Sequence, residues 1–351
     1  MEPNHSIITI HDIERDINNT LEYAEAIDAS ISPVAIQTWL GQIHQVGRKN
    51  NNWILDKINY WIKWNLPNLT QQWITFLLLV MAHVSYQEEE LMARTAHRLI
   101  TEYDMLSLRD TVTALISFAK LGYYNKELYD TLIYHALTFS LGPHDIPKLF
   151  KAMALVDTIH HDLVTTMIKS INAKMQFTVQ QAIEIMWSMA VLEIRHITVY
   201  KHLIKFTIGK SLSSGMRLML YQTYLWLYYT IHVKIPMPSV NLHHKKYHKF
   251  DPKPSKEQAE IGRCLSILGY NFINEGHIRY ISVDIIIPRL QIAIEFNGPS
   301  HYLFRSRRPT GKTRMKQRNI ISVGWRLVTI GYFDWPDNFD EQLVMIRGLI
   351  E

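Results

Sequence analysis

The sequence predicts an α-solenoid of two-helix repeats, each about 36 residues long, followed by a small α/β domain. A pattern of apolar residues around an alanine recurs four times between residues 30 and 232. Beyond residue 269, the apolar residues follow the period of two that is typical of strands. The chain has 351 residues, of which 47% are apolar and 20% are charged, so it can bury a sizeable core and global disorder is excluded.

The repeats are recognised from Ala82, Ala119, Ala154 and Ala190, which are 37, 35 and 36 residues apart. Each alanine follows a methionine or a phenylalanine, and an apolar residue nine positions later opens a second amphipathic stretch. Offsets of −4, −1 and 0 lie on one helical face, and the small alanine lets a neighbouring helix approach closely. Because one helical hairpin cannot bury its own apolar face, at least three must stack. An irregular all-α bundle is the alternative interpretation. A degenerate copy fits around His44.

The same patterns predict four parts of the chain. Prolines at 236, 238, 252 and 254 and a basic run at 243–249 indicate a linker between two folded regions. Ser255 and Gln258 have the spacing of a capping box, and Gly269 is expected to end the helix that follows. The parts are an N-terminal segment (1–29), the helical repeat array (30–232), a basic Pro/His linker (233–254) and the α/β domain (255–351).

Cysteine content and hydropathy exclude several classes of protein. Cys264 is the only cysteine, which excludes a disulfide scaffold and a zinc site built from cysteines. The longest apolar run, 74–82, is shorter than the roughly 20 residues that span a bilayer. The first residues lack the basic flank and apolar core of a secretory signal. We therefore expect no membrane partner.

Positive charge is concentrated in one C-terminal segment. The formal net charge is +5, and no Asp or Glu occurs between Phe296 and Phe333. This asymmetry indicates a polyanionic partner. The residues predicted to contact it are Arg305, Arg307, Arg308, Lys312, Arg314, Lys316 and Arg318.

The α/β domain is predicted to contain three strands and a helix. Residues 281–287 and 290–297 alternate as a β-hairpin around a turn at 288–289. A basic loop and a helix over about 313–323 follow, and residues 325–330 form a third strand. This order of elements predicts a compact sheet with helical cover.

Four ordered motifs of this domain resemble the RAP domain, an RNA-binding domain abundant in apicomplexans. They are Val283-Asp-Ile, Ile294-Glu-Phe-Asn-Gly-Pro-Ser-His301, Thr310-Gly-Lys-Thr313 and Gly324-Trp-Arg-Leu-Val328. Proteins with this domain commonly carry upstream helical repeats of the octotricopeptide or Fas-activated-kinase-like kind, which agrees with the array found here. The resemblance implies an organellar protein, mitochondrial first and plastid second. It also implies a role in RNA processing, stability, translation or ribosome assembly.

The sheet of this family is similar to the PD-(D/E)XK nucleases, especially the very-short-patch-repair-like endonucleases. Their chemistry needs two acids that hold a divalent cation and a lysine two residues after the second acid. Asp284 and Glu295 occupy the acid positions, but Asn297 stands where the lysine is required. His301 follows a Gly-Pro-Ser turn and is a candidate base or phosphate ligand.

Three interpretations of these residues stay open. In the first, Asp284 and Glu295 pair with cations of the basic helix in a scaffold without activity. In the second, they hold Mg²⁺ that contacts RNA without cutting it. In the third, Lys312 or Lys316 replaces the missing lysine in a working nuclease. The leading function is therefore binding of single-stranded RNA by the repeats and the basic module, with no cofactor. The alternatives are a metal-dependent endoribonuclease that uses Asp284 and Glu295, and a structural subunit of an organellar ribosome.

Overall fold

The computed structural model describes residues 9–26, 31–46, 53–171, 174–234, 254–279 and 281–351. The chain folds into two compact units. One comprises Met1–Ala152 with His160–Ser170, and the other comprises Met153–Ile159 with Ile171–Glu351. Most of the predicted linker, residues 235–253, lies outside the described residues. Within the part of the chain that is described, no helix is long and apolar enough to cross a membrane.

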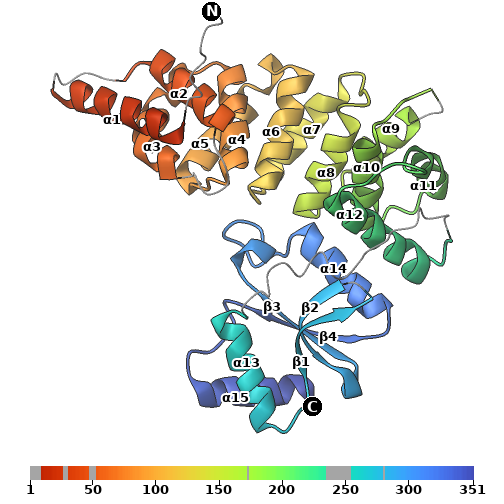
Figure 1. The fold of residues 1–351 in the computed structure, drawn as a ribbon. Helices are drawn as coiled ribbons and strands as arrows, with labels where there is room; N and C mark the ends of the chain where they lie inside the picture. The colour runs from red at the N-terminus through yellow and green to blue at the C-terminus, as the bar shows by residue number, and fades with distance from the viewer. Residues whose placement is uncertain (1–8, 27–30, 47–52, 172–173, 235–253, 280) are drawn as a thin grey trace, which may run out of the picture. The chain divides into compact units, whose positions relative to one another are not determined.

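The first unit is built of helices that follow one another in pairs (Figure 1). They are α1 (Ile10–Ala26), α2 (Pro33–Val46), α3 (Trp53–Asn65), α4 (Gln71–Val84), α5 (Glu89–Thr101), α6 (Leu108–Lys120), α7 (Lys126–Leu137), the first part of α8 (Ile146–Val156) and α9 (His161–Ser170). The first helices of successive repeats pack together, α2 against α4 and α4 against α6, and the second helix α5 packs against α7. The prediction of two-helix repeats is thereby confirmed.

The second unit continues the repeats before its sheet begins. Its repeat helices are the end of α8, α10 (Val179–Val191), α11 (Ile197–Leu203) and α12 (Ser214–Leu225). Each of the four predicted alanines lies near the end of the first helix of its repeat, on α4, α6, α8 or α10. Ala119, Ala154 and Ala190 are buried, as the close approach of neighbouring helices requires.

All four repeats end their first helix in the same way. The third residue after each alanine has a positive φ, and the next backbone N–H donates to the carbonyl of the residue before the alanine, at 2.8–3.0 Å. This geometry is the Schellman motif, which usually places glycine at the left-handed position. Those positions hold Ser85, Gly122, Asp157 and Glu193, with φ of 60°, 67°, 51° and 57°. The last two are acids, for which the left-handed conformation costs about 1 kcal/mol.

The second unit ends in a four-stranded mixed sheet. Its strands are β1 (Ile273–Ile278), β2 (Ile281–Ile287), β3 (Ile292–Asn297) and β4 (Arg326–Gly331), in that spatial order. β2 is antiparallel to β1 and β3, whereas β3 and β4 are parallel. The predicted hairpin and the later strand are confirmed. The prediction of three strands was wrong, because β1 contains Gly276 and a left-handed Glu275 and has little strand propensity.

Three helices accompany the sheet: α13 (Lys256–Ile267), α14 (Gly311–Ser322) and α15 (Phe339–Ile350). The predicted capping box is present, since Ser255 Oγ accepts from Gln258 N at 3.2 Å and Gln258 Oε1 accepts from Ser255 N at 2.7 Å. Gly269 follows α13 with φ of 80°. Cys264 is fully buried on α13.

The two faces of the sheet have different cover. One face packs with α13 and α15, in a core that includes Ile285, Ile294 and Ile346. The other face packs with α14 and with Leu225 of α12, in a core that includes Val283 and Ala293. The last repeat helix therefore supplies part of the core of the sheet.

Candidate functional site

The nuclease-like positions meet at the end of β3, where successive side chains point to opposite faces of the sheet. Glu295 is directed to the α14 face and contacts Lys316 of that helix. Phe296 packs on the opposite face, in the core formed with α13 and α15. This alternation separates a charged cluster under α14 from a pocket on the other face.

Glu295 and Lys316 form a buried ion pair. Lys316 Nζ lies 2.5 Å from Glu295 Oε2, and Glu295 is only 3% exposed. Burial raises the pKa of Glu295 to about 7, although the Lys316 ammonium opposes the increase. Among the described residues, Glu295 Oε1 has no hydrogen-bond partner. The pair is therefore the main contact that compensates this buried carboxylate, and the Asp284 backbone also acts to lower its pKa.

Asp284 lies beside this pair and accepts a hydrogen bond from Phe296 N at 2.8 Å. Its charge raises the pKa of Glu295 further, and it acts in the same direction on Glu275, whose pKa burial already raises. No group of three His, Cys, Asp or Glu side chains within the described ranges is close enough to hold a metal ion. Because Lys316 and the backbone already engage the two acids, this arrangement does not fit Mg²⁺.

Asn297 and His301 are held by neighbouring polar groups. Asn297 is buried, and its side chain hydrogen-bonds the Tyr302 hydroxyl. A lysine at this position would place a second buried cation near Lys316. His301 is half-buried, and its Nδ1 lies 3.4 Å from Thr313 Oγ1. Burial lowers the pKa of His301, and the charge of Lys316 lowers it further, so the ring is neutral at pH 7.

Three of the predicted RNA-binding arginines contact the ends of repeat helices within the second unit. Arg308 Nη2 donates to Val156 O at 2.9 Å, to Thr158 Oγ1 at 2.7 Å and to Asp157 O. These acceptors lie at the last residue of α8 and just beyond it, where backbone carbonyls lack helical partners. Arg308 thus acts as a C-terminal cap for that helix.

Arg314 and Arg318 of α14 contact the two left-handed acids of the repeats. Arg314 pairs with the Asp157 carboxylate. Arg318 Nη1 lies 2.9 Å from Glu193 Oε1, and its Nη2 donates to Val191 O at 2.7 Å. The contact surface is close-packed, because a Cβ added to Gly311 would lie 1.9 Å from Ala154 O. Figure 1 shows α14 beside these helix ends.

Sequence reasoning missed this contact between α14 and the repeats, although a signal for it exists. Two equivalent repeat positions carry acids where the other repeats carry Ser85 and Gly122. A carboxylate is unfavourable both in the left-handed conformation and at the negative end of a helix, so its presence twice indicates cationic partners.

The remaining predicted cations, Arg305, Arg307 and Lys312, are exposed. Arg307 lies over the Phe333 ring at 4.5 Å and 3.7 Å from Asp334. The RNA-binding role of all seven basic residues stays a prediction. The seven residues form two groups. Arg305, Arg307 and Lys312 are exposed, whereas the other four form hydrogen bonds or ion pairs with protein groups at shorter distances than the 3.7 Å between Arg307 and Asp334. These four are Arg308, Arg314, Lys316 and Arg318.

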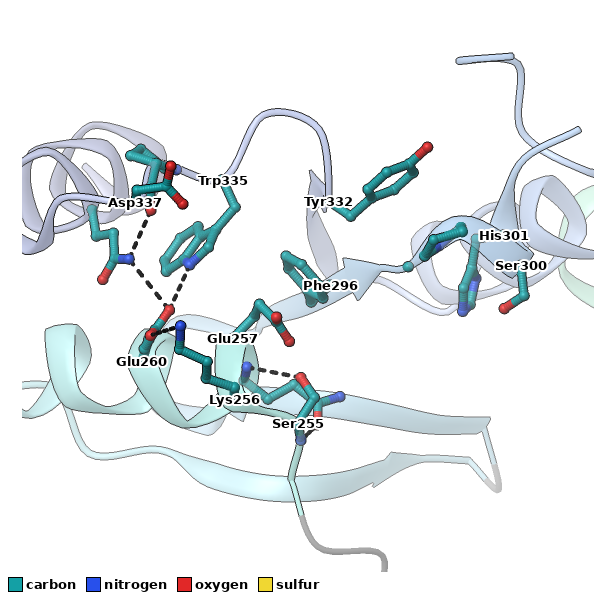
Figure 2. A pocket seen from close by; sticks show the side chains of 15 residues that line it. Ser255, Lys256, Glu257, Glu260, Phe296, Ser300, His301, Tyr332, Trp335 and Asp337 are labelled. Carbon is teal, nitrogen blue, oxygen red and sulfur yellow. Dashed lines mark hydrogen bonds and ion pairs between the residues drawn. The ribbon is translucent and has the colours of Figure 1, made fainter. Parts of the chain in front are cut away.

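A pocket opens on the other side of β3 (Figure 2). It has a volume of about 500 Å³ and lies between the first turn of α13, the turn at 298–301 and the segment after β4. Phe296, Tyr332 and Trp335 supply aromatic surface, and Glu257, Glu260 and Asp337 supply carboxylates. His301 lines its edge, so the pocket adjoins the nuclease-like positions. No periodic pattern marks residues 332–337, so this pocket could not be predicted from the sequence.

The comparisons with known proteins concern this C-terminal region. Residues 294–344 match the family model of the RAP domain. The RAP domain-containing protein, chloroplastic, of Oryza sativa subsp. japonica is 33% identical to the chain over 99 residues. That alignment covers 27% of this chain and 15% of the rice protein, so only a small part of that relative is represented here. Both matches confirm the resemblance to the RAP domain.

Proposed function

We propose that this protein binds single-stranded RNA in an organelle, through the RAP-like module and the repeats next to it. The observation that carries the proposal is the RAP match at residues 294–344, which covers the basic segment 305–318. The RAP resemblance implies that the polyanionic partner is RNA. The concentration of basic residues in one segment of the chain also favours such a partner.

The distribution of charge supports the second unit as the RNA-binding part. Residues 1–152 contain 12 Lys and Arg against 17 Asp and Glu, whereas residues 153–351 contain 25 against 15. The excess of acidic residues in 1–152 repels phosphates, and the excess of basic residues in 153–351 attracts them. We therefore place the RNA on the C-terminal repeats and the RAP-like module, with Arg305, Arg307 and Lys312 as exposed phosphate contacts.

The salt dependence of binding tests this assignment. In the triple variant Arg305→Glu, Arg307→Glu and Lys312→Glu, the log–log slope of affinity against salt should become shallower by about 2, because three phosphate contacts are lost. The measurement is fluorescence anisotropy of a labelled single-stranded RNA with the full chain.

The control reverses three exposed cations of the first unit, Arg15, Arg94 and Lys126, each of which already pairs with an acid on its own helix. It changes the net charge equally and should leave the slope unchanged. Equal effects of the two triple variants would contradict the proposed location of the RNA.

Cleavage is the rival activity. We expect RNA binding to persist in EDTA and no RNA to be cut in the presence of Mg²⁺, because Lys316 occupies Glu295 and Asn297 replaces the lysine. Magnesium-dependent products that vanish in Glu295→Gln and in Asp284→Ala would establish an endoribonuclease instead.

The cellular role rests on the resemblance alone. We propose that the protein is located in an organelle. A plastid is suggested by the relative named chloroplastic, and a mitochondrion by the usual location of proteins with this domain. RNA processing, stability, translation and ribosome assembly are the candidate processes. Organelle fractionation tests the location, and co-sedimentation with ribosomal particles would favour a structural ribosomal role over binding of free RNA.

A further inference from the structure

The pocket beside β3 has aromatic walls that are fixed in place. Trp335 Nε1 donates to Glu260 Oε2 at 2.8 Å, and Gln342 Nε2 approaches the same oxygen at 3.3 Å. The Phe296 and Trp335 rings meet edge to face, with centroids 6.3 Å apart. Tyr332 completes the aromatic lining and is 44% exposed. Fixed aromatic rings at the mouth of a cavity provide stacking surface for a planar ligand at low entropic cost.

Three carboxylates, those of Glu257, Glu260 and Asp337, line the pocket beside side chains that can donate hydrogen bonds. Glu257 has no hydrogen-bond or ion-pair partner among the described residues, and Figure 2 shows its carboxylate beside Phe296. Asp337 adds a second carboxylate to the lining. Ionised carboxylates are acceptors only, so a ligand group that binds Glu257 must present donors. A volume of about 500 Å³ lies within the range of small-ligand sites.

The mouth of the pocket tolerates an attached phosphate. The first turn of α13 lines the pocket with the positive end of its helix dipole, and so does the exposed Lys256, whose Nζ lies 3.6 Å from Glu260 Oε1. These groups offset the negative charge of Glu257 for a ligand that carries a phosphate outside the cavity.

We infer that this pocket binds one unpaired guanine base of the RNA, an inference that rests on the proposed function. Guanine presents two adjacent donors, N1–H and the N2 amino group, that match the two oxygens of Glu257. Adenine and cytosine present only one amino group, and uracil presents a single N–H between two carbonyl oxygens that repel a carboxylate. Stacking on Tyr332 and Trp335 holds the base, and Glu257 selects it.

The test measures the affinity of the full chain for two labelled RNAs of about 12 nucleotides. One is oligouridine and the other is the same RNA with one central guanine. The guanine should strengthen binding at least about fivefold, the lower limit for a bidentate base contact. Glu257→Gln should reduce this preference below about twofold and leave the affinity for oligouridine unchanged. Tyr332→Ala should weaken binding of the guanine-containing RNA about fivefold.

Glu127→Gln is the matched control. Lys126-Glu127 begins α7 after the N-cap Asn125, just as Lys256-Glu257 begins α13 after the N-cap Ser255. Both substitutions remove the same favourable charge from a first helical turn, so their effects on melting should agree. The control should keep the full guanine preference.

The outcomes separate the two proposals. If the wild type binds neither RNA, the proposed function fails. If it binds both RNAs equally, or if Glu257→Gln keeps the guanine preference, the guanine site is refuted while RNA binding stands. In that case the acidic aromatic pocket suits a cationic side chain of a protein partner.

Discussion

Glu295 shows how burial and one contact determine the state of a single residue. Its carboxyl is almost fully buried, and one of its two oxygens contacts Lys316. A buried charge that loses its ion-pair partner is strongly destabilising, whereas a protonated carboxyl is not. The ion pair therefore exists only while Glu295 is ionised, and it offsets only part of the free-energy cost of ionising this buried carboxyl. The contribution of Glu295 to stability thus depends on pH.

Stability should decrease with rising pH because of this residue. The folded-state pKa of Glu295 is raised to about 7 from an ordinary value of 4.5, so between these values the folded state binds more protons than the unfolded state. The free energy of unfolding of the wild type should fall across this range by roughly 3 kcal/mol relative to Glu295→Gln. Urea denaturation of both proteins from pH 4.5 to 8 measures the difference.

Lys316→Met tests the same ion pair by removing its cation. Its cost should be small at pH 5, where Glu295 is protonated in both proteins, and up to about 3 kcal/mol at pH 8, where the wild type keeps an ionised pair and the variant must protonate a carboxyl whose pKa has risen further. Lys312→Met, an exposed position on the same helix, is the control and should show no pH dependence. An equal loss at both pH values would contradict the assignment.

At the scale of elements, α14 is a docking helix. It presents Arg314 and Arg318 to two acids that occupy left-handed positions at the ends of repeat helices. Each acid is unfavourable by itself, through its backbone conformation and through the helix dipole, and becomes favourable only when its arginine is present. Strain in the repeats is thus offset by the contact with α14.

A double-mutant cycle on Glu193 and Arg318 should detect this coupling. Arg318→Met should cost about 2 kcal/mol, since its charge-assisted hydrogen bonds are lost. In that background Glu193→Gly should restore about 1 kcal/mol, because glycine removes both the left-handed strain and the unpaired carboxylate. In the wild-type background the same change should restore less, because it also breaks the ion pair. Urea denaturation of the four proteins gives the coupling energy.

Ser85→Gly is the control for this cycle, because Ser85 occupies the same left-handed position in a repeat of the first unit. Its effect should be independent of Arg318. If Glu193→Gly stabilised the protein equally with and without Arg318, the contact would have no role in compensating the acid.

At the scale of the whole molecule, the sheet does not form its core alone. Leu225 of the last repeat helix packs with Val283 and Ala293 on one face of the sheet. The RAP-like module and the neighbouring repeats therefore form one cooperative unit, and the same unit carries the excess of positive charge.

Truncated fragments test whether the RAP-like module and the neighbouring repeats unfold as one cooperative unit. The fragment 255–351 lacks α12 and should expose an apolar sheet face, bind a hydrophobic dye and melt without cooperativity. The fragment 153–351 retains α12 and should melt cooperatively. Circular dichroism during heating compares them, and a cooperative melt of the shorter fragment at the temperature of the longer one would show that the module folds independently.

The local elements could be predicted from the sequence alone. The alanine register, the capping box of α13 and the hairpin of β2 and β3 depend on residues a few positions apart, which helical and strand periods make visible. The positions of Asp284, Glu295, Asn297 and His301 followed from a short ordered motif. β1 escaped prediction because its strand conformation is stabilised by pairing with β2 and not by its own side chains.

Which charges meet depends on how the elements pack against one another. Arg318 and Glu193 are 125 residues apart, and the acids at the two left-handed positions indicate cationic partners without identifying which cations these are. Packing of α14 on the helix ends selects it, because the close contact of Gly311 with Ala154 brings the arginines of α14 beside the two acids. The pocket of Phe296, Tyr332 and Trp335 arises for the same reason, since three separate segments meet there only once the sheet has closed on α13.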